Sequence, residues 1–365
     1  MRILRNYILK EFFGFFLLSL GLLTFLMIMG NLIKIANLII SKGVEISGII
    51  KLFSYLIPYL LTYTIPISTL TGILLTFGRL SGDNEIIAIR TSGINIIYII
   101  LPVMIIGLML SLFLIILNDS VIPYTHYASR RAFVEIGVKN PAAFLEAGTF
   151  IDAFQNYIIF IYNIQDNKLF NIRIYELQTD NRPPRTIVAK KGEFVSIPEK
   201  SIVKLKLVDG TSDEPDPNNP YNFYKLNFKT YFINLNLSNN LQMIQKEKKP
   251  KDMNFMELKQ KVQEMKKMGI DPTVILSHLQ ERIALSFSCF VFTVIGAALG
   301  LITRSRKKTI NLSIASLIVG IYYMLLLGSE ALSINGFIHP QIGMWLPNII
   351  IGTTGIFLLS HICAY

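Results

Sequence analysis

Apolar residues along this chain are gathered into six long blocks, three on each side of a more polar middle. A helix that crosses a membrane needs about 20 mostly apolar residues, and each block is about that long or longer. The blocks cover residues 12–35, 49–77, 94–117, 283–302, 310–328 and 344–361. The pattern therefore predicts six transmembrane helices, and we expect Pro58 and Pro66 to kink the second.

The polar middle of the chain, residues 118–272, follows a different pattern. It begins with a helical stretch, and several later runs alternate apolar and polar residues, as in "VKLKL" at 203–207. Short alternating runs separated by turn residues are typical of antiparallel strands. We expect strands over 156–164, 169–177, 185–197, 201–210 and 224–237, and a helix over 253–269.

The two patterns together predict a membrane α-helical fold with an inserted antiparallel β domain of the jellyroll or sandwich type. Transmembrane helices one to three fall in residues 1–117. The β domain with its flanking helices falls in 118–272, and transmembrane helices four to six fall in 273–365.

A short charged segment, "GRLSGDNEIIAIRTSGI" at 78–94, separates the second and third apolar blocks. Its apolar quartet is too short to cross a membrane. Ser81 or Asp83 can cap the start of a helix and Gly93 can end it, so we expect a short amphipathic helix near 79–92. Asp83 and Glu85 would then offer carboxylates to basic groups of a partner, and a solvated loop helix is the alternative.

Positive charge predicts the orientation of the helices in the membrane. Basic residues gather before the first helix, between the second and third, and between the fourth and fifth: Arg2, Arg5, Lys10, Arg79, Arg90 and the run 304–308. Alternation of the helices places all of these on one side, which the excess of Lys and Arg makes cytoplasmic. Both termini are then cytoplasmic and the β domain lies outside. The first apolar block is too long for a secretory signal peptide, so we expect a retained helix.

Composition agrees with a membrane protein, since 52% of the 365 residues are hydrophobic and only 16% are charged. The net charge of +11 is explained by the cytoplasmic basic residues, and no nucleic-acid motif is present.

The sequence has no Gly-Lys dipeptide and hence no phosphate-binding Walker A loop, so any ATP must be bound by another chain. We predict no catalytic residue, no metal ligand and no cofactor. The two cysteines fall in apolar segments and are expected to be buried thiols.

A few charged residues near the apolar blocks are candidates for binding. Lys34 lies at the outer end of the first block and Lys42 lies further out. An ammonium group there suits the phosphate of an anionic lipid, although a lysine that only reaches toward the membrane surface is the alternative. His278, Glu281 and Arg282 precede the fourth block, where we expect them to anchor the helix at the interface.

The segment at 78–94 resembles the cytoplasmic coupling segment of the LptF/LptG permease family, which exports lipopolysaccharide. The stretches "MRILRNYILKEF" at 1–12, "HLQERIALSFSCFVFTVIGAALGL" at 278–301 and "GFIHPQIGMWLPNIIIGTTGIFLL" at 336–359 are also similar to that family. "KNPAAFLEAGTF" at 139–150 resembles the start of its β domain and favours LptF over LptG. Ser286 departs from the family, where proline is expected, and we expect a local effect on helix geometry.

The resemblance implies an inner-membrane permease that takes lipopolysaccharide from the periplasmic leaflet through lateral gates at the first and fifth helices. It implies a second LptF/LptG-type permease, a dimer of LptB-like ATPases, and LptC-like and LptA-like proteins that receive the lipid from a periplasmic β-jellyroll. The segment with Asp83, Glu85 and Arg90 would couple to the ATPase, with Glu85 in its groove. Lys34 would contact the lipid A phosphates, and the permease itself would need no cofactor.

Other classes of protein remain compatible with the residues alone. A membrane subunit of another ABC-type system, of the FtsX/MacB kind or for another lipid or lipoprotein, differs in helix number or in the position of the large domain. A sensor or scaffold with an extracytoplasmic β domain needs no coupling helix, and a membrane-bound enzyme needs a catalytic constellation. The residues do not distinguish a homodimer from a heterodimer.

Overall fold

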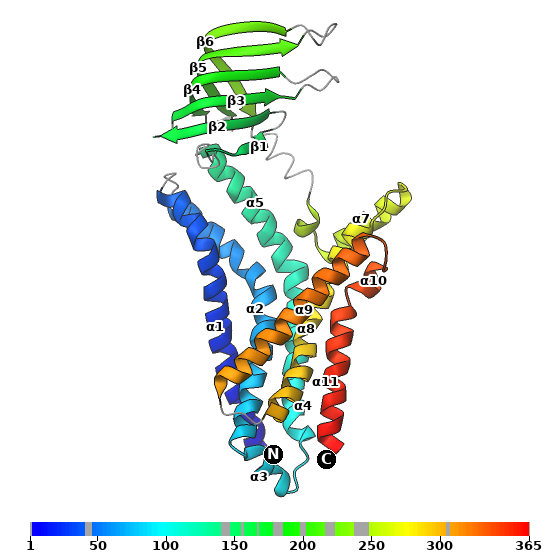
Figure 1. Cartoon of the computed structure of the whole chain (residues 1–365). Coiled ribbons are helices and arrows are strands. Elements are labelled where there is room, and N and C mark those ends of the chain that lie inside the picture. The colour runs from blue at the N-terminus through cyan, green and yellow to red at the C-terminus, as the bar shows by residue number, and fades with distance from the viewer. Residues whose placement is uncertain are drawn as a thin grey trace. The chain divides into compact units, whose positions relative to one another are not determined.

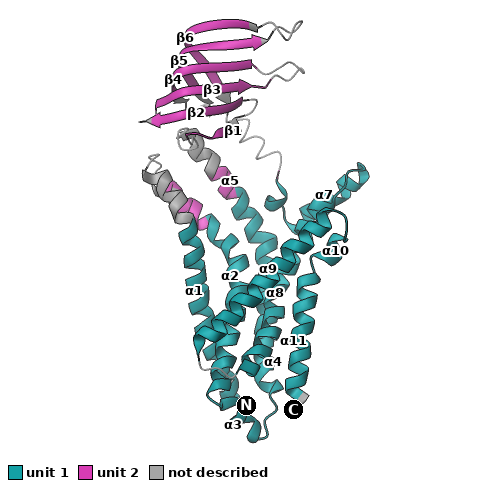
Figure 2. Ribbon diagram, viewed as in Figure 1, with its two compact units in different colours: residues 1–31, 55–127, 249–365 teal, residues 32–54, 128–248 magenta. Residues whose placement is uncertain are grey.

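The computed structural model describes residues 2–40, 46–139, 147–154, 157–165, 168–177, 185–197, 202–215, 223–236, 248–303 and 307–364. Two compact units are present (Figure 2). The first consists of residues 1–31, 55–127 and 249–365, and the second consists of residues 32–54 and 128–248.

The helices follow the predicted apolar blocks and extend beyond most of their ends. In chain order they are α1 (Arg2–Ile40), α2 (Ile46–Gly82), α3 (Glu85–Thr91), α4 (Ile97–Ile116), the π-helical turn η1 (Leu117–Val121), α5 (Ile122–Lys139), the 3₁₀ turn η4 (Pro250–Asp252), α7 (Phe255–Lys267), α8 (Thr273–Thr303), α9 (Lys308–Ile334), α10 (Pro340–Gly343) and α11 (Leu346–Ala364) (Figure 1). Within the described residues, six stretches are long and apolar enough to cross a membrane: 2–30, 50–82, 97–132, 273–303, 308–334 and 340–363. The six predicted transmembrane helices are therefore confirmed, and α2 stays helical through Pro58 and Pro66.

Two of the six spanning helices form the centre of the bundle. In the most apolar stretch of each helix, 83% of the residues of α2 and 78% of those of α8 are buried. The corresponding shares for α1 and α9 are 17% and 28%. The outer helices expose large apolar side chains such as Leu18, Leu317 and Met324. Exposed apolar side chains of this kind suit contact with lipid, which is as apolar as leucine.

Small residues allow α8 to approach its neighbours closely. A Cβ atom placed on Gly300 would lie 2.8 Å from the Cβ of Phe77 in α2, and one on Gly107 in α4 would lie 2.1 Å from the hydroxyl of Thr293 in α8. Such close approach is a main source of helix association in membranes, where burial of apolar surface gives little driving force. Both cysteines are free thiols; Cys289 of α8 is buried, as expected, but Cys363 is half-buried, so the expectation for Cys363 is wrong.

Ser286 connects α8 to the π-helical turn η1. Its hydroxyl accepts a hydrogen bond from Nδ2 of Asn118 (3.0 Å) and donates one to the carbonyl of Arg282 (2.8 Å). Asn118 also donates to the carbonyl of Leu114 at 3.1 Å, which helps to satisfy the irregular backbone of η1. The departure from proline at this position therefore does more than change local helix geometry, because the serine supplies a contact between two helices.

The second unit contains one antiparallel sheet, which confirms the predicted β domain. Its strands are β1 (Phe150–Phe154), β2 (Tyr157–Gln165), β3 (Lys168–Glu176), β4 (Arg185–Ile197), β5 (Ile202–Pro215) and β6 (Phe223–Asn236). Each strand pairs with the next in chain order, so the described strands form a meander without the crossing connections of a jellyroll (Figure 1). β1 is an additional strand that the alternation of residues did not predict.

One face of this sheet carries the hydrophobic core of the second unit. The buried residues come from β2 to β6 and are Ile159, Ile161, Leu169, Ile172, Ile174, Ile187, Ala189, Leu205, Leu207 and Ile233. Asn171 and Asp209 have φ angles of 53° and 54°, and the regular pairing of the strands is interrupted at both. Interruptions of this kind bend a sheet, and a bent sheet can cover part of its own apolar face.

Candidate functional site

The charged segment at 78–94 forms a tight turn and a short helix at one end of the first unit. α2 continues to Gly82, and α3 begins after Asn84, which has a left-handed φ of 58° and no side-chain cap. The prediction that Ser81 or Asp83 caps this helix is wrong, because the Ser81 hydroxyl instead donates to the carbonyl of Leu301 in α8 (3.0 Å). The predicted end at Gly93 is confirmed by its φ of 79°.

Arg79, in the last turn of α2, is the centre of a polar network. Its guanidinium forms an ion pair with Glu11 of α1 and donates to the Tyr7 hydroxyl at 2.6 Å. It also lies 3.3 Å from a carboxylate oxygen of Glu85 and 3.5 Å from one of Asp83. The Tyr7 hydroxyl in turn donates to Glu85 at 3.1 Å. We refer to Tyr7, Glu11, Arg79, Asp83 and Glu85 as the Arg79 network.

The Arg79 network is partly shielded from water. The side chain of Glu11 is 16% exposed, and those of Arg79 and Glu85 are 32% and 33% exposed. An ion pair at this depth depends on both partners, since removing one leaves a charge that is costly to desolvate. The network connects α3 to α1 and to α2.

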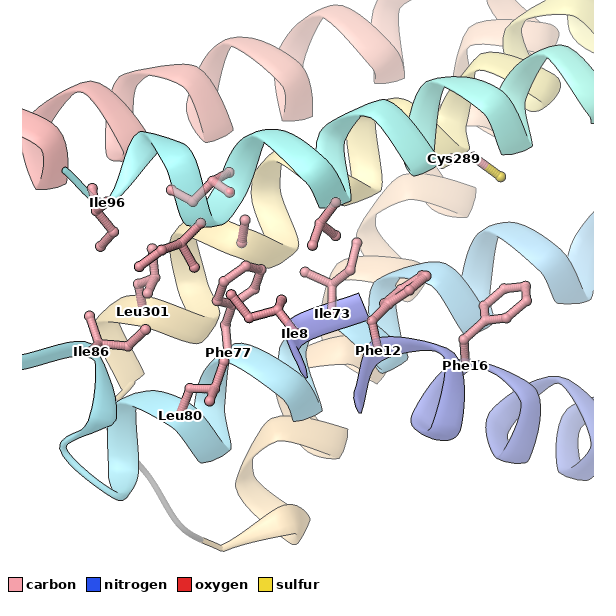
Figure 3. Packing of buried hydrophobic residues seen from close by; sticks show 14 of the residues in the cluster. Ile8, Phe12, Phe16, Ile73, Phe77, Leu80, Ile86, Ile96, Cys289 and Leu301 are labelled. Atoms are coloured by element: carbon pink, nitrogen blue, oxygen red, sulfur yellow. The ribbon is translucent and has the colours of Figure 1, made fainter. Parts of the chain in front are cut away.

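An apolar contact fixes another side of α3. Ile86 is 6% exposed and belongs to a buried cluster with Leu80 of α2, Ile96 and residues of α1 and α8 (Figure 3). Ile87 is 43% exposed and faces outward. α3 is therefore held on two sides, and its remaining face is accessible.

The structure brings together some of the residues predicted for this site and separates others. Asp83 and Glu85 both contact Arg79, whereas Arg90 donates to the carbonyl of Ile362 in α11 at 2.8 Å. The side chain of Lys34, on the helical backbone of α1, and the whole of Lys42 lie outside the described residues.

Sequence reasoning did not assign Tyr7, Glu11 or Arg79 to the site. A signal for them is present, because Glu11 is an isolated acid at the start of the first apolar block and Arg79 is a base at the end of the second. Opposite charges at the same predicted membrane surface are candidates for a pair.

A second polar feature of the first unit is a cavity of about 250 Å³. Its lining residues come from α2, η1, α5, η4, α8 and α9, and they are Tyr59, Thr62, Tyr63, Asn118, Ile122, His126, Lys251, His278, Glu281, Arg282, Leu285 and Glu330. Nδ1 of His126 lies 2.6 Å from a carboxylate oxygen of the buried Asp252. Arg282 donates to the carbonyls of Met253 (2.8 Å) and Pro250 (2.9 Å). His278, Glu281 and Arg282, which we expected to anchor the helix at the interface, thus line this cavity.

The six spanning helices with an inserted β sheet define a multi-pass helical membrane protein with a β domain. The chain matches the family model of the lipopolysaccharide export system permease LptF/LptG over residues 6–361. It is also similar to the uncharacterized protein RP871 of Rickettsia prowazekii (strain Madrid E), with 24% identity over 245 residues. That alignment covers 66% of this chain and 66% of the relative.

The chain therefore belongs to the LptF/LptG family, whose members are permease components of the lipopolysaccharide export system. Family membership and the six apolar helices make it a multi-pass protein of the inner membrane. The family match does not separate LptF from LptG.

We expect the Arg79–Glu11 ion pair to contribute measurably to stability. Arg79→Met leaves the Glu11 carboxylate without the guanidinium, so it should lower the midpoint of thermal unfolding of the purified chain in detergent. A double-mutant cycle with Glu11→Gln should give a coupling free energy of about 1 kcal/mol or more. The exposed pair of Lys261 and Glu264 is the matched control and should couple by less than this. Additive effects of Arg79→Met and Glu11→Gln would show that the two side chains do not interact.

Proposed function

We propose that this chain is the permease subunit that extracts lipopolysaccharide from the periplasmic leaflet of the inner membrane and passes it to a periplasmic bridge. Its family supports the permease role. A separate ATPase supplies the energy, in agreement with a sequence that has no Walker A loop. The observation that carries the coupling part of the proposal is the Arg79 network, which connects the short helix α3 to two spanning helices.

The geometry of the first unit supports the proposed orientation. The Arg79 network brings the first turns of α1 to α3, and the bond from Arg90 to Ile362 brings the end of α11 to the same place. Both termini therefore lie near α3 (Figure 1). Arg2, Arg5 and Lys10 belong to this end of the bundle, and clustered positive charge marks the cytoplasmic side. The β domain is then periplasmic.

In the proposed mechanism, α3 transmits movement from the ATPase to the spanning helices. A force applied to α3 reaches α1 through Tyr7 and Glu11 and reaches α2 through Arg79. It also reaches α11 through the hydrogen bond of Arg90. Because these contacts oppose independent movement of α3, closure of the ATPase shifts the helices together and narrows the lipid-binding space between two permeases.

The acidic side of α3 is the proposed contact for an LptB-like ATPase dimer. Asp83, Glu85 and Glu11 place three carboxylates around the Arg79 guanidinium. The carboxylate of Glu85 is partly exposed and is in reach of basic groups on a partner. The exposed Ile87 offers an apolar contact beside it.

The remaining partners are proposed on the basis of the family match alone. We propose a second LptF/LptG-type permease, which is a homologue or a second copy of this chain, and LptC-like and LptA-like periplasmic proteins. Lys34, with Lys42 beyond it, is proposed to contact the phosphates of lipid A. A point charge at the outer end of α1 suits a phosphate that enters from that leaflet.

The main alternative is an ABC-type membrane subunit for another lipid or lipoprotein, and a scaffold or sensor is a second. Affinity purification from the native membrane separates these functions. Co-elution of an ATPase together with lipopolysaccharide supports the proposal. Co-elution of an ATPase with a different lipid supports the first alternative, and absence of any ATPase supports the second.

We expect Glu85→Gln to uncouple ATP hydrolysis from lipid release, because it removes the carboxylate proposed to contact the ATPase. Tyr7→Phe is the matched control, since it removes a hydrogen bond of Glu85 inside the chain and leaves the carboxylate in place. In liposomes that contain the assembled complex, Glu85→Gln should lower ATP-dependent release by about tenfold or more, as expected when a bond to a charged group of about 1.5–3 kcal/mol is lost. Tyr7→Phe should have a smaller effect. Equal losses in the two variants would assign Glu85 to the internal network alone.

We expect Lys34→Glu to weaken contact with lipopolysaccharide, because it replaces the attraction to a phosphate with repulsion. Photo-cross-linking from a reactive residue at the neighbouring position Ile33 measures this contact in membranes. The yield should fall about tenfold or more, whereas the Lys261→Glu control on α7 should leave it unchanged. Cross-linking at the wild-type level in Lys34→Glu would remove this lysine from the lipid site.

A further inference from the structure

The cavity in the first unit contains a group of side chains that the proposed transport function does not use. His278, Glu281 and Glu330 each direct one ligand-type atom toward the others, and these atoms all lie within 4.8 Å of one another. His278 and Glu281 are three residues apart on α8, and Glu330 comes from α9. The group therefore joins two spanning helices.

The spacing of the group is close to that of a metal site. Nδ1 of His278 and a carboxylate oxygen of Glu281 are 3.4 Å apart. Zinc with bonds of about 2.0–2.1 Å in tetrahedral geometry places neighbouring ligand atoms about 3.4 Å apart. The Glu330 carboxylate also lies within 4.8 Å of both atoms, so the three side chains can converge on one ion.

Packing holds the two helices in register on one side of this group. Leu326, one turn before Glu330 on the same face of α9, is buried in the apolar cluster that contains Leu285 of α8. Asn348 of α11 accepts a hydrogen bond from Tyr322 of α9 and donates one to the carbonyl of Ala284 in α8. The backbone that carries the three side chains is therefore fixed before any ligand binds.

The negative charges of Glu281 and Glu330 favour binding of a cation. Two partly buried carboxylates this close repel one another, and among the described residues Glu330 has no hydrogen bond or ion pair. Arg282, the basic side chain next in sequence, is directed to the carbonyls of Pro250 and Met253. Lys251 and His126 also line the cavity, and His126 is paired with Asp252.

A second observation indicates that the cavity accommodates a polar ligand. The hydroxyl of Thr62 is buried and, within the part of the chain that the structure describes, makes no hydrogen bond. Thr62 is 5% exposed and lines the same cavity. Buried hydroxyl groups usually have a partner, so this one is available to a ligand or to a water bound to it.

We propose that His278, Glu281 and Glu330 bind one divalent transition-metal ion, with zinc as the best fit. An imidazole nitrogen together with carboxylates favours zinc over magnesium and calcium, which prefer ligand sets made of oxygen alone. Three protein ligands leave a fourth position open toward the cavity. The bound ion fixes α9 to α8, and the site does not depend on the proposed identity of the transported lipid.

Calorimetric titration of the complete, tag-free chain in detergent tests the proposal, after removal of metal with a chelator. Zinc chloride should bind at one equivalent per chain, and magnesium chloride should bind far more weakly. Glu330→Gln and His278→Gln should each weaken zinc binding by about tenfold or more. The matched controls Glu264→Gln, on the exposed surface of α7, and His339→Gln should bind zinc as the wild type does. Glu330→His, which supplies another nitrogen ligand, should retain binding.

Thermal unfolding gives a second measurement that does not rely on affinity alone. Zinc should raise the unfolding temperature of the wild type and of Glu330→His, and at the same zinc concentration should raise that of Glu330→Gln and His278→Gln by clearly less. Absence of stoichiometric zinc binding by the wild type would overturn the proposal. Equal zinc affinity in the wild type, Glu330→Gln and His278→Gln would also overturn it.

Discussion

The ion pair between Arg79 and Glu11 is the interaction on which the α3 end of the helical bundle depends. It connects the end of the second spanning helix to the start of the first, and Tyr7 and Glu85 extend it to α3. A charge pair at the end of a helical bundle costs less to desolvate than one at its centre. It still resists separation, because separation leaves each partly buried charge without its partner. A seven-residue helix of marginal intrinsic stability is thereby fixed to two long ones.

Close packing between helices stabilises the rest of the bundle. α8 and α2 approach closely at Gly300 and α8 and α4 at Gly107, where a larger side chain would collide with its neighbour. Contacts of this type support shape-specific packing in lipid, where apolar burial alone does not select one arrangement. The hydrogen bond between Asn118 and Ser286 adds a polar connection beside the irregular turn η1. Displacement of α3 is therefore expected to be carried along whole helices.

The sequence was sufficient to predict the features that depend on one segment at a time. Six spanning helices followed from apolar blocks because a helix is the main way to satisfy backbone groups in lipid, and the alternating runs predicted most of the sheet. Features that need two distant segments were missed. Ser81 was expected to cap α3 but bonds to Leu301, which is 220 residues away, and Glu330 joins His278 only through the packing of α9 on α8. The register between helices decides such contacts, and local patterns do not contain it.

We propose that α3 and α1 move as one body when a partner ATPase acts on α3. Spin labels at the exposed positions Ile87 on α3 and Ile3 on α1 measure this directly by pulsed electron paramagnetic resonance in the assembled complex. We expect the distance between the two labels to be the same without nucleotide and with trapped ATP, while labels placed on two paired permeases change their separation. A shift or broadening of the Ile87–Ile3 distance on ATP binding would contradict it, because α3 would then move independently of the helices it is proposed to drive.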